Sequence, residues 1–283
     1  MSEQVTERNA LENVLSAMGE VAVAVSGGVD SLTLAAFAHR HLGKRCTMFH
    51  AVSAAVPSEG TQRTRALAES EGWTLRVIDA GEFDNGDYMR NPVNRCFYCK
   101  TSLYGSIRPH TSAQIVSGTN LDDLGEYRPG LIAAKEHGVR HPFVEAAMSK
   151  QRVRALASHL GLGEVAELPS SPCLSSRIET GIAIDPAMLA SVHAAESLVT
   201  VRLAPETVRC RVRAKGVVIE LDQSSLAGLQ GASADALSAE VAGLFREAGF
   251  DYTVTFEPYR TGSAFLHFKR LTSASSAAPG RPS

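Results

Sequence analysis

The sequence predicts an α/β protein with a doubly wound parallel sheet, followed by a second, smaller α+β domain. In the first part, short apolar segments alternate with segments of helical spacing, as in sheets with right-handed crossovers. A Pro/Ser-rich stretch at residues 168–172 ends this rhythm, and strand-like segments then come in pairs. We expect a first domain over residues 1–170, a second over 171–271 and a disordered tail over 272–283.

The elements of the first domain follow from this alternation. Val21–Val25 is an uninterrupted apolar run, typical of a strand buried on both faces. A helix over Ser31–His41 follows, and Gly43 ends it. The next expected strands cover residues 45–52, 75–79 and 114–117, and the next helices cover 60–71, 99–107, 131–136 and 149–160.

The second domain has a different order of elements. A helix is expected over residues 186–198, and segments 208–212 and 217–221 alternate as the strands of a hairpin do. An amphipathic helix over 234–248 and strands at 252–256 and 264–268 complete the domain. The chain has no internal repeat.

Composition excludes several classes of protein. The 283 residues are 44% hydrophobic and carry a formal net charge of −2, too little positive charge for a protein that coats nucleic acid. No apolar run approaches the roughly 20 residues that span a bilayer, and the polar N-terminus has no signal core. The five cysteines form an odd set, typical of reduced thiols. We therefore expect a cytoplasmic protein without nucleic-acid or membrane partners.

A glycine loop, SGGVDS at residues 26–31, lies between the first strand and its helix. Its glycines allow a sharp turn and a close ligand, and the helix start adds unpaired N–H groups and a positive dipole end. A simple N-capped turn is the alternative, but the complete string is far more specific than a glycine pair. The loop therefore predicts a polyanion site made by Ser26, Gly27, Gly28, Asp30 and Ser31.

A second glycine turn, Gly118-Thr119-Asn120, follows the fourth strand and precedes two aspartates. Ligands of such sheets bind at the carboxyl ends of the strands, and carboxylates suit Mg²⁺. We expect ATP at this turn and Mg²⁺ on Asp123, with an Asx-type turn before a capped helix as the alternative. Lys100 and Lys150 are further candidates to bind the phosphates.

The SGGVDS loop resembles the pyrophosphate loop of the PP-loop ATP pyrophosphatases, a superfamily with a HUP-like fold that includes GMP synthetase, NAD synthetase and tRNA-thiolating enzymes. There the loop holds the β,γ-pyrophosphate that leaves when AMP is transferred to a substrate. The chain has no Gly-x-x-x-x-Gly-Lys-Ser/Thr string. The missing lysine suits attack at the α-phosphate rather than γ-phosphoryl transfer.

Three further segments resemble one branch, the LarE family of sulfur transferases that act in synthesis of the nickel-pincer cofactor. They are NRCFYCK at residues 94–100, GTNLDDLGEYRPG at 118–130 and SPCLSSRI at 171–178. The likeness runs from about Leu11 to Arg270 in the order of the family. It implies that ATP adenylylates a carboxylate of a pyridinium-3,5-biscarboxylate mononucleotide, which becomes a thiocarboxylate.

In the sacrificial form of this chemistry a cysteine thiolate displaces AMP, gives up its sulfur and becomes dehydroalanine. The matching position is Cys173, for which an inert buried cysteine is the alternative. Arg177 or Arg128 is expected to lower the pKa of the thiol. Glu196 matches a family acidic residue near the sulfur-donor site, or else is a surface charge.

Cys96 and Cys99 add a CxxC pair to this pattern. With Cys173 they suit a 4Fe-4S cluster with one open iron, a form that the family includes and that makes sulfur transfer catalytic. Tetrahedral zinc, a redox pair and an unremarkable cysteine pair are the alternatives. Cys46 and Cys210 fall inside predicted strands, and we expect them to be structural.

Arg209, Arg211 and Arg213 alternate along one predicted strand and so share a face. The resemblance assigns the phosphate of the substrate to arginines of this strand, and a guanidinium fork suits phosphate. A solvated face of an edge strand is the alternative.

Other functions remain open at this stage. A tRNA thiolase is expected to show a basic RNA-binding face, and an amide-forming synthetase needs a glutaminase domain or an ammonia channel; the sequence shows neither. A non-catalytic adenine-nucleotide-binding protein is the alternative from another class. The family assembles into hexamers, so the resemblance implies a homo-oligomer that binds a small-molecule nucleotide substrate.

Overall fold

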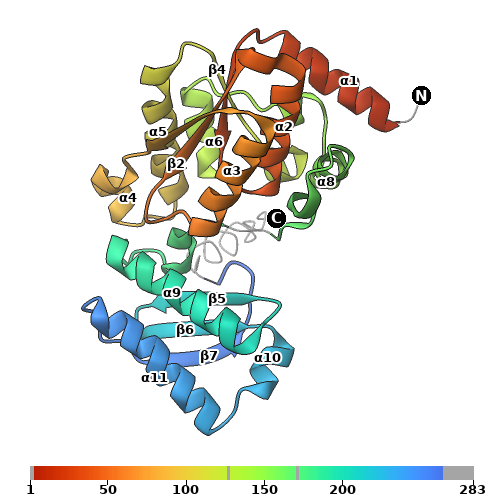
Figure 1. Ribbon diagram of the computed structural model, residues 1–283. Coiled ribbons are helices and arrows are strands. Elements are labelled where there is room, and N and C mark those ends of the chain that lie inside the picture. Colours follow the sequence, from red (N-terminus) through yellow and green to blue (C-terminus); the bar gives the residue numbers. More distant parts are fainter. Residues whose placement is uncertain (1–2, 126–127, 170–171, 264–283) are drawn as a thin grey trace, which may run out of the picture. The chain divides into compact units, whose positions relative to one another are not determined.

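The computed structural model describes residues 3–125, 128–169 and 172–263. These form two compact units, which we call unit 1 (residues 1–85 and 96–172) and unit 2 (86–95 and 173–283). Each unit contains its own sheet (Figure 1). The strand expected at residues 264–268 and the expected disordered tail lie outside the described residues.

The sheet of unit 1 has four strands in the order β3-β2-β1-β4, and all neighbouring pairs are parallel. The strands are β1 (Val21–Val25), β2 (Cys46–Val52), β3 (Thr74–Asp79) and β4 (Gln114–Ser117). Every residue of β1 is buried, as its unbroken apolar run predicts. All four expected strands are therefore confirmed.

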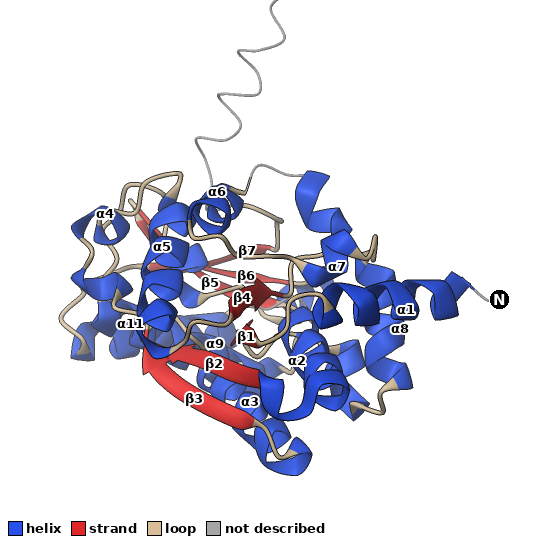
Figure 2. Ribbon diagram, turned by 90° about the horizontal axis from the view of Figure 1, so that it is seen from above, coloured by secondary structure: helices blue, strands red, loops and turns tan. Residues whose placement is uncertain are grey.

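Helices cover both faces of this sheet (Figure 2). Val21, Val23 and Val25 pack into a core with residues of α1, α2, α3 and α8, whereas Ala22 and Ala24 pack with α5 and α6. Successive residues of β1 thus face opposite helical layers, which makes the sheet doubly wound. The helices of unit 1 are α1 (Glu3–Ser16), α2 (Val29–Leu42), α3 (Ser58–Glu71), α5 (Arg95–Ile107), α6 (Pro129–Glu136), α7 (Pro142–Glu145) and α8 (Lys150–His159).

Unit 2 is a small mixed sheet with helices. Strands β5 (Val208–Arg213) and β6 (Gly216–Leu221) form the expected antiparallel hairpin, and β7 (Val254–Pro258) runs parallel to β6. The chain between β6 and β7 forms α10 (Gln223–Gly228) and α11 (Ala232–Glu247). Helix α9 (Pro186–Leu203) contacts α11, where the Ser191 hydroxyl donates to the Leu244 carbonyl at 3.2 Å. The expected fold class is confirmed.

The chain enters unit 2 twice. Residues 86–95, with the short helix α4 (Gly86–Met89), leave unit 1 between β3 and α5. Asn91 is buried at φ +53 and its amide donates to the Glu179 and Ile182 carbonyls, each at 2.9 Å. The buried Tyr88 hydroxyl lies 2.6 Å from the Ser175 hydroxyl. This early segment thereby fixes the chain on both sides of residue 177.

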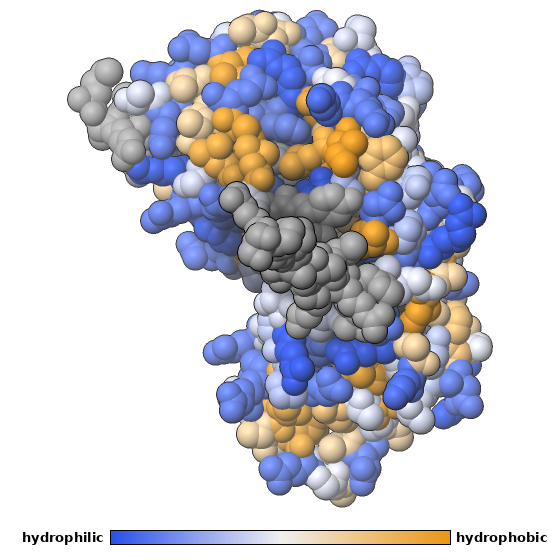
Figure 3. Space-filling model, turned by 180° about the vertical axis from the view of Figure 1, so that it is seen from behind, coloured by the Kyte–Doolittle hydropathy of each residue, from blue (hydrophilic) through white to orange (hydrophobic). Residues whose placement is uncertain are grey.

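The surface is mixed in polarity. The face in Figure 3 shows hydrophilic side chains interrupted by smaller apolar areas. No helix within the described ranges is long and apolar enough to cross a bilayer. Large apolar side chains with substantial exposure are Val77, Leu121, Leu124, Ile132, Val201 and Tyr259.

Candidate functional site: a glycine loop and a cysteine loop

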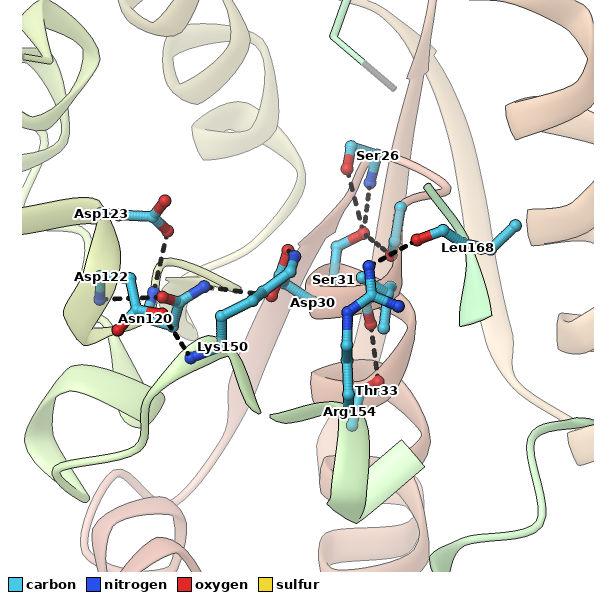
Figure 4. A network of polar contacts seen from close by, with 12 residues as sticks. Ser26, Asp30, Ser31, Thr33, Asn120, Asp122, Asp123, Lys150, Arg154 and Leu168 are labelled. Atoms are coloured by element: carbon cyan, nitrogen blue, oxygen red, sulfur yellow. Dashed lines mark hydrogen bonds and ion pairs between the residues drawn. The ribbon is translucent and has the colours of Figure 1, made fainter. Parts of the chain in front are cut away.

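The SGGVDS loop connects β1 to the first turn of α2 (Figure 4). The Ser31 hydroxyl accepts from the Ser26 amide at 3.0 Å and donates to the Gly28 carbonyl at 3.1 Å, which folds the loop back on itself. The N-cap of α2 is Gly28, which has no side chain that could bond to the first amides of the helix. The first amides of α2 therefore have no intrahelical acceptor, as an anion site requires.

Two glycines are required by close backbone contacts. Gly27 has φ +82, and a Cβ at this position would lie 2.5 Å from the Gly60 carbonyl oxygen of α3. A Cβ on Gly118 would lie 2.8 Å from the Ser31 nitrogen. The structure thus brings the two predicted glycine turns together at the start of α2.

A polar network joins these turns at the carboxyl edge of the sheet (Figure 4). The Asn120 side chain donates to Asp30 Oδ1 at 3.1 Å, and Lys150 Nζ pairs with Asp30 Oδ2. The Lys150 backbone amide donates to Asp122 Oδ2 at 3.1 Å. Asp30, Asn120 and Lys150, predicted separately from three parts of the sequence, therefore lie in one network.

Both carboxylate oxygens of Asp123, the expected Mg²⁺ ligand, have partners within the protein. Its Oδ2 accepts from the Asn120 amide at 3.0 Å, and its Oδ1 pairs with Arg128 at 2.9 Å. Asp30 is likewise paired, with Lys150. Lys100 lies on α5 against the start of α6, with its Cγ 3.1 Å from where a Cβ of Gly130 would be.

Two histidines, the buried His50 and the half-buried His141, lie beside the turns, and the sequence pattern did not indicate either. His50 Nδ1 lies 2.9 Å from the Val25 carbonyl and Nε2 lies 2.9 Å from the Thr61 hydroxyl. His141 Nδ1 lies 2.9 Å from the Ser117 hydroxyl, which in turn is 3.1 Å from the Thr119 hydroxyl. Burial lowers the pKa of both histidines. The neutral form of each is therefore favoured in the folded protein.

Acidification is expected to destabilise unit 1. Both histidines have an ordinary pKa of 6.5, so the unfolded chain takes up protons below this pH before the folded protein does. The free energy of unfolding should therefore be highest above pH 6.5 and should decrease as the pH falls below 6.5. Urea unfolding followed by the fluorescence of Trp73, the single tryptophan, measures this. His50→Gln should reduce the slope, and an unchanged slope in that variant would contradict the account.

The candidate metal-binding cysteines belong to different units. Cys96 is exposed and Cys99 half-buried, and both lie in the first two turns of α5, which begins at Arg95 rather than at the expected Cys99. The spacing i, i+3 places them on one side of the helix. Cys173 belongs to unit 2. In the described ranges no three His, Cys, Asp or Glu side chains are grouped for a metal ion.

Cys46 and Cys210 are buried, as expected of structural cysteines. Burial raises the pKa of Cys46 to about 12, and that of Cys210 is raised well above its usual value. Neither thiol forms an appreciable thiolate at neutral pH.

Cys173 precedes the 3₁₀ turn Leu174–Arg177 and is partly exposed. Its carbonyl accepts from the Ser176 amide at 3.0 Å and from Arg177 Nη1 at 3.3 Å. Arg177 also forms a bidentate pair with Glu196, at 2.9 and 3.0 Å. The two residues that the resemblance assigns to sulfur chemistry, Cys173 and Glu196, are thus joined through Arg177, which donates to the backbone of Cys173.

The Arg177–Glu196 pair is expected to be a major support of this loop, because the arginine side chain is only 4% exposed. Glu196→Gln leaves that buried charge without its counter-ion and should cost about 3 kcal/mol of unfolding free energy. Chemical denaturation followed by circular dichroism tests this. Glu240→Gln is the control, since it breaks the exposed Arg202–Glu240 pair and should cost about 0.5 kcal/mol. Equal losses in the two variants would contradict the expectation.

The three strand arginines have different surroundings. Arg211 is 5% exposed and donates to Glu220 and to the Ser176 carbonyl, which ties β5 to the Cys173 loop. Arg213 pairs with Glu220 at 2.8 Å. Arg209 lies over the Tyr259 ring, and burial lowers its pKa. Although β5 is an edge strand, these arginines do not form a solvated row.

Comparison with known proteins gives three relatives. An uncharacterised protein of Synechocystis is 35% identical over 260 residues, covering 89% of this chain and 95% of that protein. The pyridinium-3,5-bisthiocarboxylic acid mononucleotide synthase of Lactiplantibacillus plantarum is 30% identical over 231 residues, covering 80% of this chain and 83% of the synthase. An uncharacterised protein of Methanocaldococcus jannaschii is 27% identical over 165 residues, covering 56% of this chain and 61% of that protein. No family model matches the chain.

A parallel sheet whose first strand leads through SGGVDS into a helix is the arrangement that the resemblance to the PP-loop class predicts. The extent of the match to the Lactiplantibacillus synthase narrows this class. The chain belongs to the family of that synthase, the LarE family.

Proposed function

We propose that the chain is an ATP-dependent sulfur transferase that converts a carboxylate of a pyridinium-3,5-biscarboxylate mononucleotide into a thiocarboxylate. The observation that carries this proposal is the match to a bisthiocarboxylic acid mononucleotide synthase over 83% of the synthase. The loop geometry agrees with it, because unpaired helix amides, hydroxyls and Lys150 are concentrated where a polyphosphate would bind.

The first step is adenylylation. An oxygen of the substrate carboxylate attacks the α-phosphorus of ATP, and the bond to the β-phosphate oxygen breaks, so that pyrophosphate leaves with the electron pair. The amides at the start of α2 would hold the departing charge. Lys150 can turn from Asp30 to a phosphate when Mg²⁺ approaches the aspartate, since both groups of this pair are partly exposed, at 34% and 26%.

The second step places sulfur on the activated carboxyl. The Cys173 thiolate attacks the acyl carbon and AMP leaves, which gives a thioester. Loss of the Cα proton of Cys173 to solvent then forms the Cα–Cβ double bond, and the bond between Cβ and Sγ breaks with its electron pair on sulfur. A thiocarboxylate is left on the product and dehydroalanine in the chain. The partial exposure of Cys173 and the two hydrogen bonds to its carbonyl support this role, because the loop is fixed while the thiol is accessible.

A catalytic version of sulfur transfer would use iron and sulfide. Three thiolates, from Cys96, Cys99 and Cys173, are the number that holds a 4Fe-4S cluster with one iron open, although the described residues do not group three such ligands. When bound, the cluster would supply that open iron for a transferable sulfide. Iron and acid-labile sulfide after anaerobic purification should be stoichiometric, whereas stoichiometric zinc or no metal would refute the cluster.

Arg209 is the best placed of the three arginines for the substrate phosphate. Arg211 and Arg213 share the fully buried Glu220, which neutralises much of their charge. The lowered pKa of Arg209 reflects a desolvated cation, which a bound phosphate would stabilise.

The proposal is tested by pyrophosphate release from ATP and Mg²⁺ with different acceptors. Release should depend on the pyridinium biscarboxylate mononucleotide. Release with tRNA or with a carboxylate and ammonia would indicate a thiolase or an amide-forming synthetase. No release with any acceptor, despite ATP binding, would indicate a nucleotide-binding protein without this chemistry.

A further inference from the structure

A guanidinium lies against the SGGVDS loop from the side of α3. Arg63 Nη1 donates to the Gly27 carbonyl at 2.6 Å in a partly buried position. Within unit 1 as described, this is the one hydrogen bond of the Arg63 side chain, and no carboxylate pairs with it. The loop thus contacts a cation whose charge is not neutralised by an ion pair.

The bond to Gly27 fixes the direction of one loop amide. In a planar trans peptide the carbonyl and the following N–H point in opposite directions. With the Gly27 carbonyl directed at Arg63, the Gly28 N–H is directed away from α3. This N–H is one of the four at the start of α2 without an intrahelical acceptor. The arginine also polarises the peptide, which makes the amide a stronger donor.

Neighbouring residues hold the same stretch of backbone from the same side. His50 binds the Val25 carbonyl and contacts Thr61 of α3. A Cβ on Gly60 would lie 3.4 Å from the Ser26 carbonyl oxygen. The consecutive carbonyls of Val25, at the end of β1, and of Ser26 and Gly27 in the loop therefore face β2 and the first turns of α3. Arg63 is the charged member of this support.

We propose that Arg63 is a positioning residue of the pyrophosphate site, which aims and polarises the Gly28 amide toward the β- and γ-phosphates. This inference rests on the proposed function of the loop. When the bond between the α-phosphorus and the β-phosphate oxygen breaks, the electron pair passes to pyrophosphate. Its added negative charge is then stabilised by the amide and by the nearby guanidinium.

Calorimetric titration of the full chain with inorganic pyrophosphate and, separately, with AMP in the presence of Mg²⁺ tests the role. Arg63→Gln removes the charge, and Arg63→Lys keeps it. Arg65→Gln is the control, because Arg65 is an exposed arginine of the same helix. Thermal melts of each variant report folding.

We expect Arg63→Gln to weaken pyrophosphate binding about tenfold to a hundredfold, with AMP binding changed less than about twofold. Arg63→Lys should recover most of the affinity, and Arg65→Gln should match the wild type. Unchanged pyrophosphate binding in Arg63→Gln would overturn the role of Arg63 but not the proposed function. Equal losses of pyrophosphate and AMP binding, together with a lowered melting temperature, would do the same. A wild type that binds neither ATP nor pyrophosphate would overturn the proposed function as well.

Discussion

Gly27→Ala is expected to abolish ATP binding by the chain. The new Cβ would lie 2.5 Å from the Gly60 carbonyl oxygen and would require φ +82 from an L-residue. Backbone atoms on both sides leave no flexible group to move, so the loop itself must shift. We expect the free energy of unfolding to fall by about 3 kcal/mol. We expect the affinity for ATP to fall by more than about a hundredfold. Calorimetric ATP titration and urea unfolding measure the two effects.

Gly19→Ala is the matched control for this prediction. Gly19 has a similar φ of +76, but nothing lies within 4 Å of a Cβ at that position. Gly19→Ala should therefore lower the free energy of unfolding by only about 1 kcal/mol, the cost of a left-handed alanine, and should bind ATP as the wild type does. If Gly27→Ala behaved like Gly19→Ala, close packing of the loop on α3 would have no role in nucleotide binding.

Cys173→Ser is expected to separate the two proposed steps. Substrate-dependent pyrophosphate release should persist, because the loop of unit 1 does not include this residue. Thiocarboxylate formation should fall by more than about a thousandfold, since serine supplies no sulfur and is a weaker nucleophile. Mass spectrometry of the nucleotide product measures the second step.

Cys46→Ala is the matched control, because it removes a thiol that burial keeps protonated. This variant should lose about 1 kcal/mol of stability and retain thiocarboxylate formation. Thiocarboxylate formation at the wild-type rate in Cys173→Ser would show that the sulfur passes through another residue.

The strands and most helices of unit 1 were predictable because each has a strong local pattern. The apolar run of β1 and the glycine string after it are examples. Helix α1 was missed because the start of the sequence is mostly polar, although Leu11 and Leu15 of this helix are buried in the core. Residues 86–95 belong to unit 2 through Asn91, whose side chain donates hydrogen bonds to the Glu179 and Ile182 carbonyls. Both carbonyls are about ninety residues away in the sequence. No local pattern contains such contacts.

The types of residue in the site could be predicted from the sequence, but their side-chain contacts could be predicted only in part. The network of Asp30, Asn120 and Lys150 follows from the rule that ligands bind at the carboxyl ends of parallel strands. Arg63 was not found, because in the sequence it is one arginine of an amphipathic helix. The pairing of Arg211 and Arg213 with Glu220 was also missed, since it depends on the register of the β5–β6 hairpin.

The central claim is that the chain couples cleavage of ATP at the α-phosphorus to sulfur transfer onto a pyridinium carboxylate. The most direct measurement is chromatography with mass spectrometry after incubation with ATP, Mg²⁺ and pyridinium-3,5-biscarboxylate mononucleotide. We expect AMP together with a nucleotide in which one carboxylate oxygen has been replaced by sulfur. ADP in place of AMP, or a substrate recovered without sulfur from protein that binds ATP, would contradict this claim.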